Sequence, residues 1–288
     1  MNGATLVGLG AILLWSLLAL LTVLSGTMPA FELAAATFAI GGGAGLLTAA
    51  LRGRLGALAQ PWPVWAVGVG GLFSYHALYF AALRIAPAAE AGLFNYLWPL
   101  LIVLFSALLP GEKLAMRHVG GAILGFAGLL VLVAGPQSPM HAGLAVAPRY
   151  FAGYGLAFAA AIVWAAYSVL SRRFKRVPTD AVAGFCLATA ALAAVCHSIF
   201  EPTVWPDRAS QWAAIVALGL GPVGLAFYVW DYGVKHGDIR LLGIAAYAAP
   251  VISTLALVAP GHAAQSASLV IACLLIVAGA VVATWRRA

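Results

Sequence analysis

The sequence predicts an all-α membrane protein with ten transmembrane helices, arranged as two inverted five-helix repeats. Hydrophobic residues make up 64% of the 288 residues and charged residues only 8%, whereas a soluble domain carries about 25% charge. The apolar residues form ten continuous runs, each close to the roughly 20 residues that a helix needs to cross a bilayer. Because a backbone in lipid must form helices or a closed barrel, and the runs do not alternate as barrel strands do, we expect helices.

The ten predicted helices follow one another with short connections. In chain order they span residues 3–24, 29–51, 62–85, 87–108, 113–134, 152–173, 179–200, 210–235, 239–259 and 263–285. The longest turn-rich stretch, 135–151, is the expected extracytoplasmic linker between an N-terminal repeat, 1–134, and a C-terminal repeat, 152–288. Since each repeat has an odd number of helices, equivalent helices run in opposite directions.

The distribution of basic residues predicts the orientation of the chain. If the N-terminus lies inside, twelve of the fifteen Lys and Arg residues fall on the inner side, and only Arg84, Arg149 and Arg208 fall outside. This asymmetry follows the positive-inside rule. We therefore expect a multi-pass membrane protein, N-in and C-in. The net charge of +7 then reflects topology and contact with anionic lipid, and we expect no nucleic-acid partner.

Weak internal symmetry supports the two repeats. One register aligns Tyr96 and Pro99 with Tyr247 and Pro250, and it also pairs Tyr79 with Trp230 and Arg84 with Lys235. A proline inside a helix removes a backbone hydrogen bond and tends to kink the helix. We expect Pro99 and Pro250 to act as hinges, although membrane helices also tolerate proline without motion.

Polar and amphipathic side chains at membrane depth are rare and usually functional. Aromatic residues often form a belt at the membrane interface, and the positions of Trp205, Trp212 and Trp285 fit such a belt. Other aromatic residues lie well inside their helices, nearer the middle of the bilayer. The predicted substrate-binding residues are Trp15, Tyr75, His76, Tyr79, Asn95, Tyr96, Trp98, Trp164, Tyr167, Trp230 and Tyr247. Aromatic rings bind flat apolar groups and attract ammonium, while hydroxyl and amide groups orient a polar head. These residue types favour a substrate that is a small zwitterion with an apolar or aromatic side chain.

Two residues are candidates for proton coupling. His76 is one, because the reference pKa of a histidine side chain is about 6.5, but its ring can equally donate to a neighbouring carbonyl and never titrate. Asp231 lies one helical turn from Lys235, so a structural ion pair is an equally valid interpretation. Because no carboxylate falls clearly at mid-membrane, we expect facilitated movement down the substrate gradient.

Other classes of function are less compatible with the residues. No His-Glu-x-x-His or Gly-x-Ser-x-Gly pattern occurs, so we expect no enzyme, catalytic group, metal or cofactor. A proton-coupled multidrug or quaternary-ammonium exporter would share the aromatic rings but needs an acid, for which only Asp231 is available. A receptor or purely structural role also stays open. We expect a monomer or a weak homodimer.

Short motifs resemble a known family. Gly111-Glu112, followed by Gly120-Gly121 and Gly125-x-x-Gly128, resembles the repeat ending of the EamA-like branch of the drug/metabolite transporter superfamily. The second half departs from this pattern, because Gly261-His262 stands where Gly-Glu is expected. The resemblance covers nearly the whole chain.

Two further motifs narrow this resemblance. Tyr75-His76-x-x-Tyr79 and Asn95-Tyr96-Leu97-Trp98-Pro99 are most similar to the superfamily's aromatic amino acid exporters. That similarity implies export of aromatic and other neutral amino acids across the inner membrane. It also implies a central cavity lined by Tyr75, His76, Tyr79, Tyr96, Trp98 and Trp164.

Overall fold

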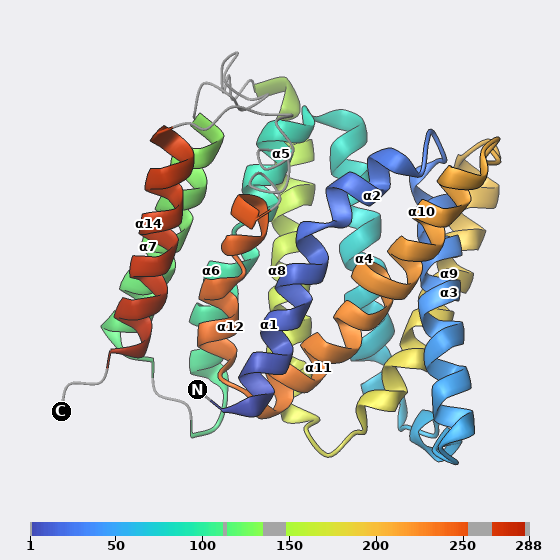
Figure 1. The fold of residues 1–288 in the computed structure, drawn as a ribbon, viewed down its shortest axis with the longest axis horizontal. Helices are drawn as coiled ribbons and strands as arrows, with labels where there is room; N and C mark the ends of the chain where they lie inside the picture. The colour runs from blue at the N-terminus through green and yellow to red at the C-terminus, as the bar shows by residue number, and fades with distance from the viewer. Residues whose placement is uncertain (1, 112–113, 135–147, 253–266, 286–288) are drawn as a thin grey trace.

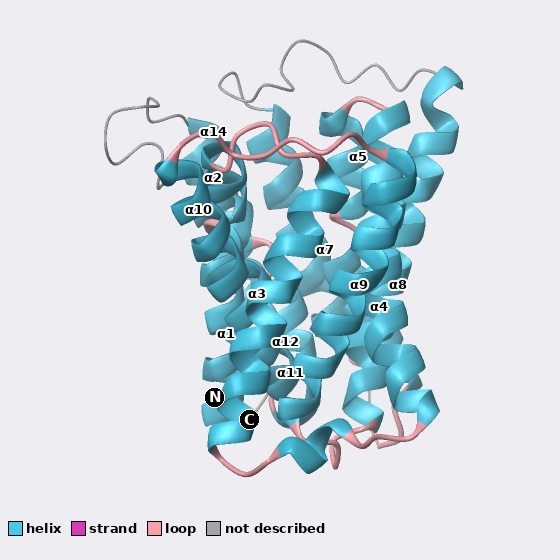
Figure 2. Cartoon of the chain, turned by 90° about the vertical axis from the view of Figure 1, so that its right-hand side faces the viewer, coloured by secondary structure: helices cyan, strands magenta, loops and turns pink. Residues whose placement is uncertain are grey.

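The computed structural model describes residues 2–111, 114–134, 148–252 and 267–285, and these ranges contain helices and no strand (Figure 2). Seven helical stretches are long and apolar enough to cross a membrane: Gly3–Leu24, Ala30–Leu51, Trp62–Ile85, Ala91–Leu108, Phe151–Arg173, Thr179–Phe200 and Ala209–His236. Shorter apolar helices cover Met116–Val131, Ile239–Ile252 and Val270–Ala283. The chain is therefore a helical membrane protein. The linker over 135–147 and the Gly261-His262 pair lie outside the described ranges.

The helices are labelled in Figure 1. In chain order they are α1 (Gly3–Ser16), α2 (Leu18–Leu24), α3 (Ala30–Leu51), α4 (Trp62–Ile85), α5 (Ala88–Asn95), α6 (Trp98–Phe105), α7 (Met116–Ala134), α8 (Phe151–Arg173), α9 (Val182–Phe200), α10 (Ala209–Leu220), α11 (Ala226–His236), α12 (Ile239–Ala245) and α14 (Ala267–Thr284). Side chains cap the starts of several helices: Asn2 accepts from the backbone N–H of Thr5 at α1, and Asp238 accepts from those of Arg240 and Leu241 at α12. Such caps satisfy backbone donors that have no partner within the helix.

The fourth and ninth predicted helices are each interrupted in the middle. The breaks are turns at 96–97 and 246–247, the same place in each half. Pro99 and Pro250 follow these turns closely, and neither can donate to the carbonyl four residues earlier. The kinks expected from the two prolines are thus present as full breaks, and motion at them stays a prediction.

The first and eighth predicted helices are also discontinuous. Pro222 within the eighth predicts a kink there, whereas nothing in the sequence of the first indicated a break. The first breaks at Leu17, where the hydroxyl of Ser16 donates to the carbonyl of Leu13 at 2.6 Å. A serine bonded to an earlier carbonyl competes with the helical ladder and bends the helix. The eighth passes from α10 to α11 through a π-helical turn, Gly221–Leu225, that contains Pro222, a common cause of kinks.

The main helix contacts join the two halves of the chain. α3 packs against α9, α4 against α8, α1 against α11, α6 against α12 and α7 against α14. The last pair lies side by side at one edge of the molecule (Figure 1). Because each pair takes one helix from each half, the halves are interleaved. The buried side chains near the middle therefore come from both.

The contact between α7 and α14 depends on two glycines. A Cβ atom at Gly121 would lie 2.5 Å from the carbonyl oxygen of Gly279, and one at Gly279 would lie 2.5 Å from that of Gly121. Small residues let helix backbones approach this closely in lipid. Neither carbonyl can rotate away as a side chain would, so the pair has no room for a methyl group.

We expect Gly121→Ala to lower the free energy of unfolding by about 1–3 kcal/mol, because overpacking forces backbone shifts. The neighbouring Gly120 is a matched control, since no atom lies within 4 Å of its Cβ position. Gly120→Ala should be neutral or slightly stabilising. Thermal unfolding of the two purified variants in detergent checks this, and equal stability would contradict the close backbone contact.

Candidate functional site

Four helices meet at a group of five rings, which we call the aromatic cluster: Trp15, Trp98, Trp164, Phe227 and Trp230. Trp15 and Trp98 come from α1 and α6 in the first half, and the others come from α8 and α11 in the second. The ring centroid of Trp15 lies 5.6 Å from that of Trp164 and 5.0 Å from that of Trp230. Trp98, Trp164 and Trp230 are 7%, 3% and 0% exposed. Their indoles therefore face the protein interior and not the lipid.

Two indole N–H groups of the cluster are fixed by hydrogen bonds. Trp230 donates through Nε1 to the hydroxyl of Ser168 on α8 at 3.1 Å. Trp15 donates through Nε1 to the carbonyl of Pro222 at 3.1 Å, within the π-helical turn. A buried indole needs such a partner, and the bonds hold the rings in place. Neither acceptor was identified from the sequence, because their roles depend on contacts between distant segments.

Tyr75, His76 and Tyr79 extend the cluster along α4. The centroid of the Tyr75 ring lies 5.3 Å from that of Trp164, and Tyr75 stacks on Tyr79 at 6.1 Å. The amide nitrogen of Asn95, at the end of α5, donates to the hydroxyl of Tyr75 at 3.1 Å. Tyr75 thus meets a tryptophan directly, and Tyr79 and Asn95 contact Tyr75. Tyr75, His76 and Tyr79 are half-buried.

His76 is used as a hydrogen-bond donor. Its Nδ1 lies 2.7 Å from the carbonyl oxygen of Leu72, one turn earlier, and a carbonyl can only accept, so Nδ1 carries the hydrogen. Its ring makes edge contacts with Phe38, Phe80 and Phe227. This geometry agrees with the interpretation in which His76 donates to a neighbouring carbonyl. The three phenylalanines were not among the predicted site residues, although Phe227 lies one turn before Trp230.

The remaining predicted residues divide between two places. Tyr167 is buried beside Trp164, with ring centroids 5.3 Å apart. Tyr247 instead belongs to a second core, formed by α7, α14 and the segment after α12, with Leu129 and Ile276, and Tyr96 packs against that core. The structure therefore brings Tyr167 to the aromatic cluster and places Tyr247 elsewhere, and substrate contact by either stays a prediction.

Asp231 and Lys235 form a buried ion pair on α11. Lys235 Nζ lies 2.8 Å from Asp231 Oδ2, which also accepts from the hydroxyl of Thr179 at 2.8 Å. The ammonium of Lys235 donates in addition to the carbonyl of Val177 at 3.1 Å. The pair thus ties α11 to the connection between α8 and α9. Of the two interpretations of Asp231, this geometry favours the structural ion pair.

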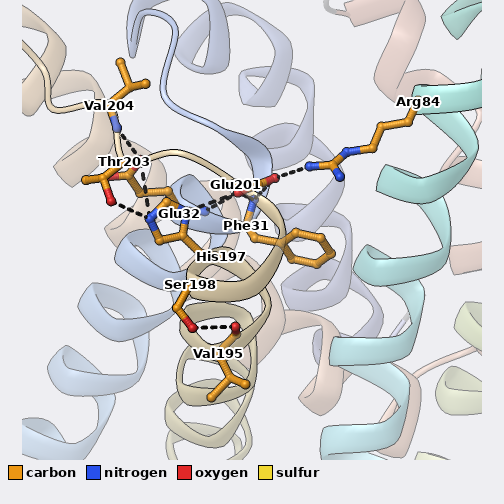
Figure 3. A network of polar contacts seen from close by, with 9 residues as sticks. All are labelled: Phe31, Glu32, Arg84, Val195, His197, Ser198, Glu201, Thr203 and Val204. Atoms are coloured by element: carbon orange, nitrogen blue, oxygen red, sulfur yellow. Dashed lines mark hydrogen bonds and ion pairs between the residues drawn. The ribbon is translucent and has the colours of Figure 1, made fainter.

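A polar network lies at the opposite end of the molecule and centres on Glu201 (Figure 3). Its carboxylate accepts from the backbone N–H groups of Phe31 and Glu32 at the start of α3. Arg84 donates to it at 2.7 Å, and His197 Nδ1 lies 3.3 Å away. The network joins the ends of α4 and α9 to the start of α3. Sequence reasoning missed Glu201, because Phe31, Glu32 and Arg84 lie more than 100 residues before it in the chain.

A shallow pocket lies beside this network. Arg84 and Glu201 line it together with apolar residues at the start of α3, on α4 and around the end of α9: Pro29, Ala30, Phe80, Leu83, Phe200 and Pro202. Phe80 also contacts His76 and Phe31, with ring centroids 5.8 Å and 5.6 Å apart. A line of rings therefore connects the aromatic cluster to the pocket at this end.

The sequence matches known transporters, and the fold matches a solved structure. The profile of the EamA-like transporter family matches residues 2–134 and 151–285. The aromatic amino acid exporter YddG of Ancylobacter novellus is 60% identical over 284 residues, which cover 98% of this chain and 97% of that protein. YddG of Salmonella typhimurium is 29% identical, over 87% of this chain and 86% of that protein. A solved crystal structure with 60% sequence identity superposes with a TM-score of 0.93 and covers 98% of this chain and 96% of its own. The chain belongs to the EamA-like transporter family.

Proposed function

We propose that this protein exports aromatic and other neutral amino acids, or similar small metabolites, across the bacterial inner membrane. The observation that carries the proposal is the aromatic cluster, because its buried rings come from both halves of a membrane protein. The relatives named aromatic amino acid exporters support the class of substrate. Indole and phenol faces suit flat apolar side chains, and their electron-rich faces attract ammonium.

The protein works by alternating access, with α4, α5 and α6 rocking against α11 and α12. Discontinuous helices at matching positions of two repeats are typical of transporters that bind substrate near the membrane midplane. The breaks at 96–97 and 246–247 fit this pattern, and Pro99 and Pro250 are the proposed hinges. Trp98 of the aromatic cluster begins α6, directly after the break at 96–97.

Ten spans in two inverted repeats underlie this mechanism. Supporting observations are the two segments matched by the family profile and the interleaved helix pairs. Arg84 and Lys235, which the internal alignment equates, also form ion pairs at opposite ends of the molecule, at 2.7 Å and 2.8 Å. The N-terminus and the end of α14 lie at the same end in Figure 1, which supports an even number of crossings. The N-in, C-in orientation rests on the distribution of basic residues.

Transport is facilitated and not proton-coupled. Both candidates for coupling are engaged: His76 donates to Leu72, and the carboxylate of Asp231 accepts from Lys235 and Thr179. The same engagement of Asp231 argues against a proton-coupled multidrug or quaternary-ammonium exporter, which would need that acid for its cation.

Counterflow in liposomes tests this function. We expect the purified protein to exchange labelled tryptophan for unlabelled tryptophan at the same initial rate with and without a pH gradient. Tetraphenylphosphonium, a lipophilic cation, should compete poorly. Absence of tryptophan exchange would contradict the substrate class and favour a receptor role. Accumulation driven by the pH gradient, or displacement by the cation alone, would favour the proton-coupled alternative.

A further inference from the structure

The side-chain amide of Asn95 is buried and only half satisfied. Asn95 is the last residue of α5, just before the break at 96–97, and is 5% exposed. Its amide nitrogen donates to the hydroxyl of Tyr75 at 3.1 Å. Its Oδ1 has no hydrogen-bond partner in the described part of the chain. A buried acceptor without a donor costs free energy, so a ligand that supplies a donor would bind favourably here.

The surroundings of this oxygen favour a positive donor. Tyr75, which holds the amide, lies 5.3 Å from the Trp164 ring and 6.1 Å from the Tyr79 ring, measured between centroids. The faces of such rings attract ammonium. Asn95 also ends a helix, and the carboxyl end of a helix carries partial negative charge. The amide oxygen, the ring faces and the negative end of the helix therefore all favour a positively charged hydrogen-bond donor at this place.

We infer that Asn95 Oδ1 accepts a hydrogen bond from the α-ammonium group of the substrate. The inference rests on the proposed function, and it specifies which group of the amino acid substrate Asn95 binds. The substrate must then carry a free amino group, whereas the side chain lies against the rings of Trp164 and Tyr79. Analogues that lack the amino group are poor ligands.

Two tryptophan analogues separate the polar groups of the substrate. Tryptamine keeps the ammonium and lacks the carboxylate, and indole-3-propionate keeps the carboxylate and lacks the ammonium. In the wild-type protein, we expect tryptamine to inhibit tryptophan counterflow at a concentration about 10- to 100-fold lower than indole-3-propionate, the range for one hydrogen bond to a charged group.

Variants at Asn95 test whether the preference for tryptamine depends on Oδ1. Asn95→Leu removes the acceptor at similar size, and the advantage of tryptamine should fall to less than about threefold. Asn95→Asp keeps an oxygen acceptor and should keep the advantage. Thr189→Val is the matched control, because Thr189 Oγ1 is another buried oxygen without a partner in the described ranges, but it lies on α9, outside the aromatic cluster. This variant should behave as the wild type.

The outcomes distinguish this inference from the proposed function. The role of Oδ1 is overturned if the wild type prefers indole-3-propionate, or if Asn95→Leu keeps the full preference for tryptamine. In either case, the proposed function still holds as long as the wild type exchanges tryptophan. Failure of the wild type to exchange tryptophan overturns the function itself. If Asn95→Leu no longer transports tryptophan, the preference can be measured by binding instead. The affinities of the purified variant for labelled tryptamine and labelled indole-3-propionate then give the ratio that counterflow inhibition would have given.

Discussion

Trp164→Ala is expected to abolish tryptophan counterflow while the protein still inserts into the membrane. The indole of Trp164 links the aromatic cluster to α4, and its ring contacts those of Trp15, Tyr75, Trp98, Tyr167, Phe227 and Trp230. Its loss removes the shared wall of the proposed substrate path. The cavity left behind should also cost about 3–5 kcal/mol of stability, so inserted protein must be measured beside flux.

Trp205 offers a control with the same substitution. It is 70% exposed and stacks on Trp212 with ring centroids 6.1 Å apart, away from the aromatic cluster. Trp205→Ala should keep wild-type counterflow per inserted molecule. Wild-type flux in Trp164→Ala would exclude this ring from the substrate path.

Lys235→Met is expected to lower the free energy of unfolding by about 3–5 kcal/mol, because it leaves the buried carboxylate of Asp231 without its cation. The double variant Asp231→Asn with Lys235→Met should recover most of that loss, since it removes both charges together. Thermal unfolding in detergent measures the difference. The pair between the exposed Arg54 and the half-buried Asp180, at 3.6 Å, is a control, and Arg54→Ala should cost about 0–1 kcal/mol.

The same double variant tests the role of Asp231 in transport. If the ion pair is structural, tryptophan exchange by the double variant should be as independent of a pH gradient as exchange by the wild type. A pH dependence that is present in the wild type and lost in the double variant would make Asp231 a coupling residue. A double variant less stable than Lys235→Met alone would contradict the account of the pair.

Helix positions were the most predictable part of the fold, because membrane thickness fixes the length of an apolar run. The third predicted helix, 62–85, coincides with α4, and the seventh, 179–200, ends with α9. The breaks near Pro99 and Pro250 followed from proline chemistry. The break at Leu17 did not, because it involves a serine hydroxyl that could equally have bonded within an unbroken helix.

The candidate site was predictable in residue type but not in full geometry. Ring-bearing residues deep in their helices indicated an interior cluster, and Tyr75 does meet Trp164. The sequence alignment equates Tyr96 with Tyr247, yet it could not show that Tyr247 is buried in a second core. The contacts of Glu201 with the start of α3 join segments far apart in the sequence, and no local pattern indicates such a contact.

The central claim is that the substrate passes through the aromatic cluster between the two halves. Photolabelling with p-azidophenylalanine, an aromatic amino acid that crosslinks on illumination, tests it most directly. The account predicts labelled peptides from α4, α6 and α8, which carry Tyr75, Trp98 and Trp164, and predicts that excess tryptophan suppresses the labelling. Tryptophan-sensitive labelling confined to α7 and α14 would contradict it.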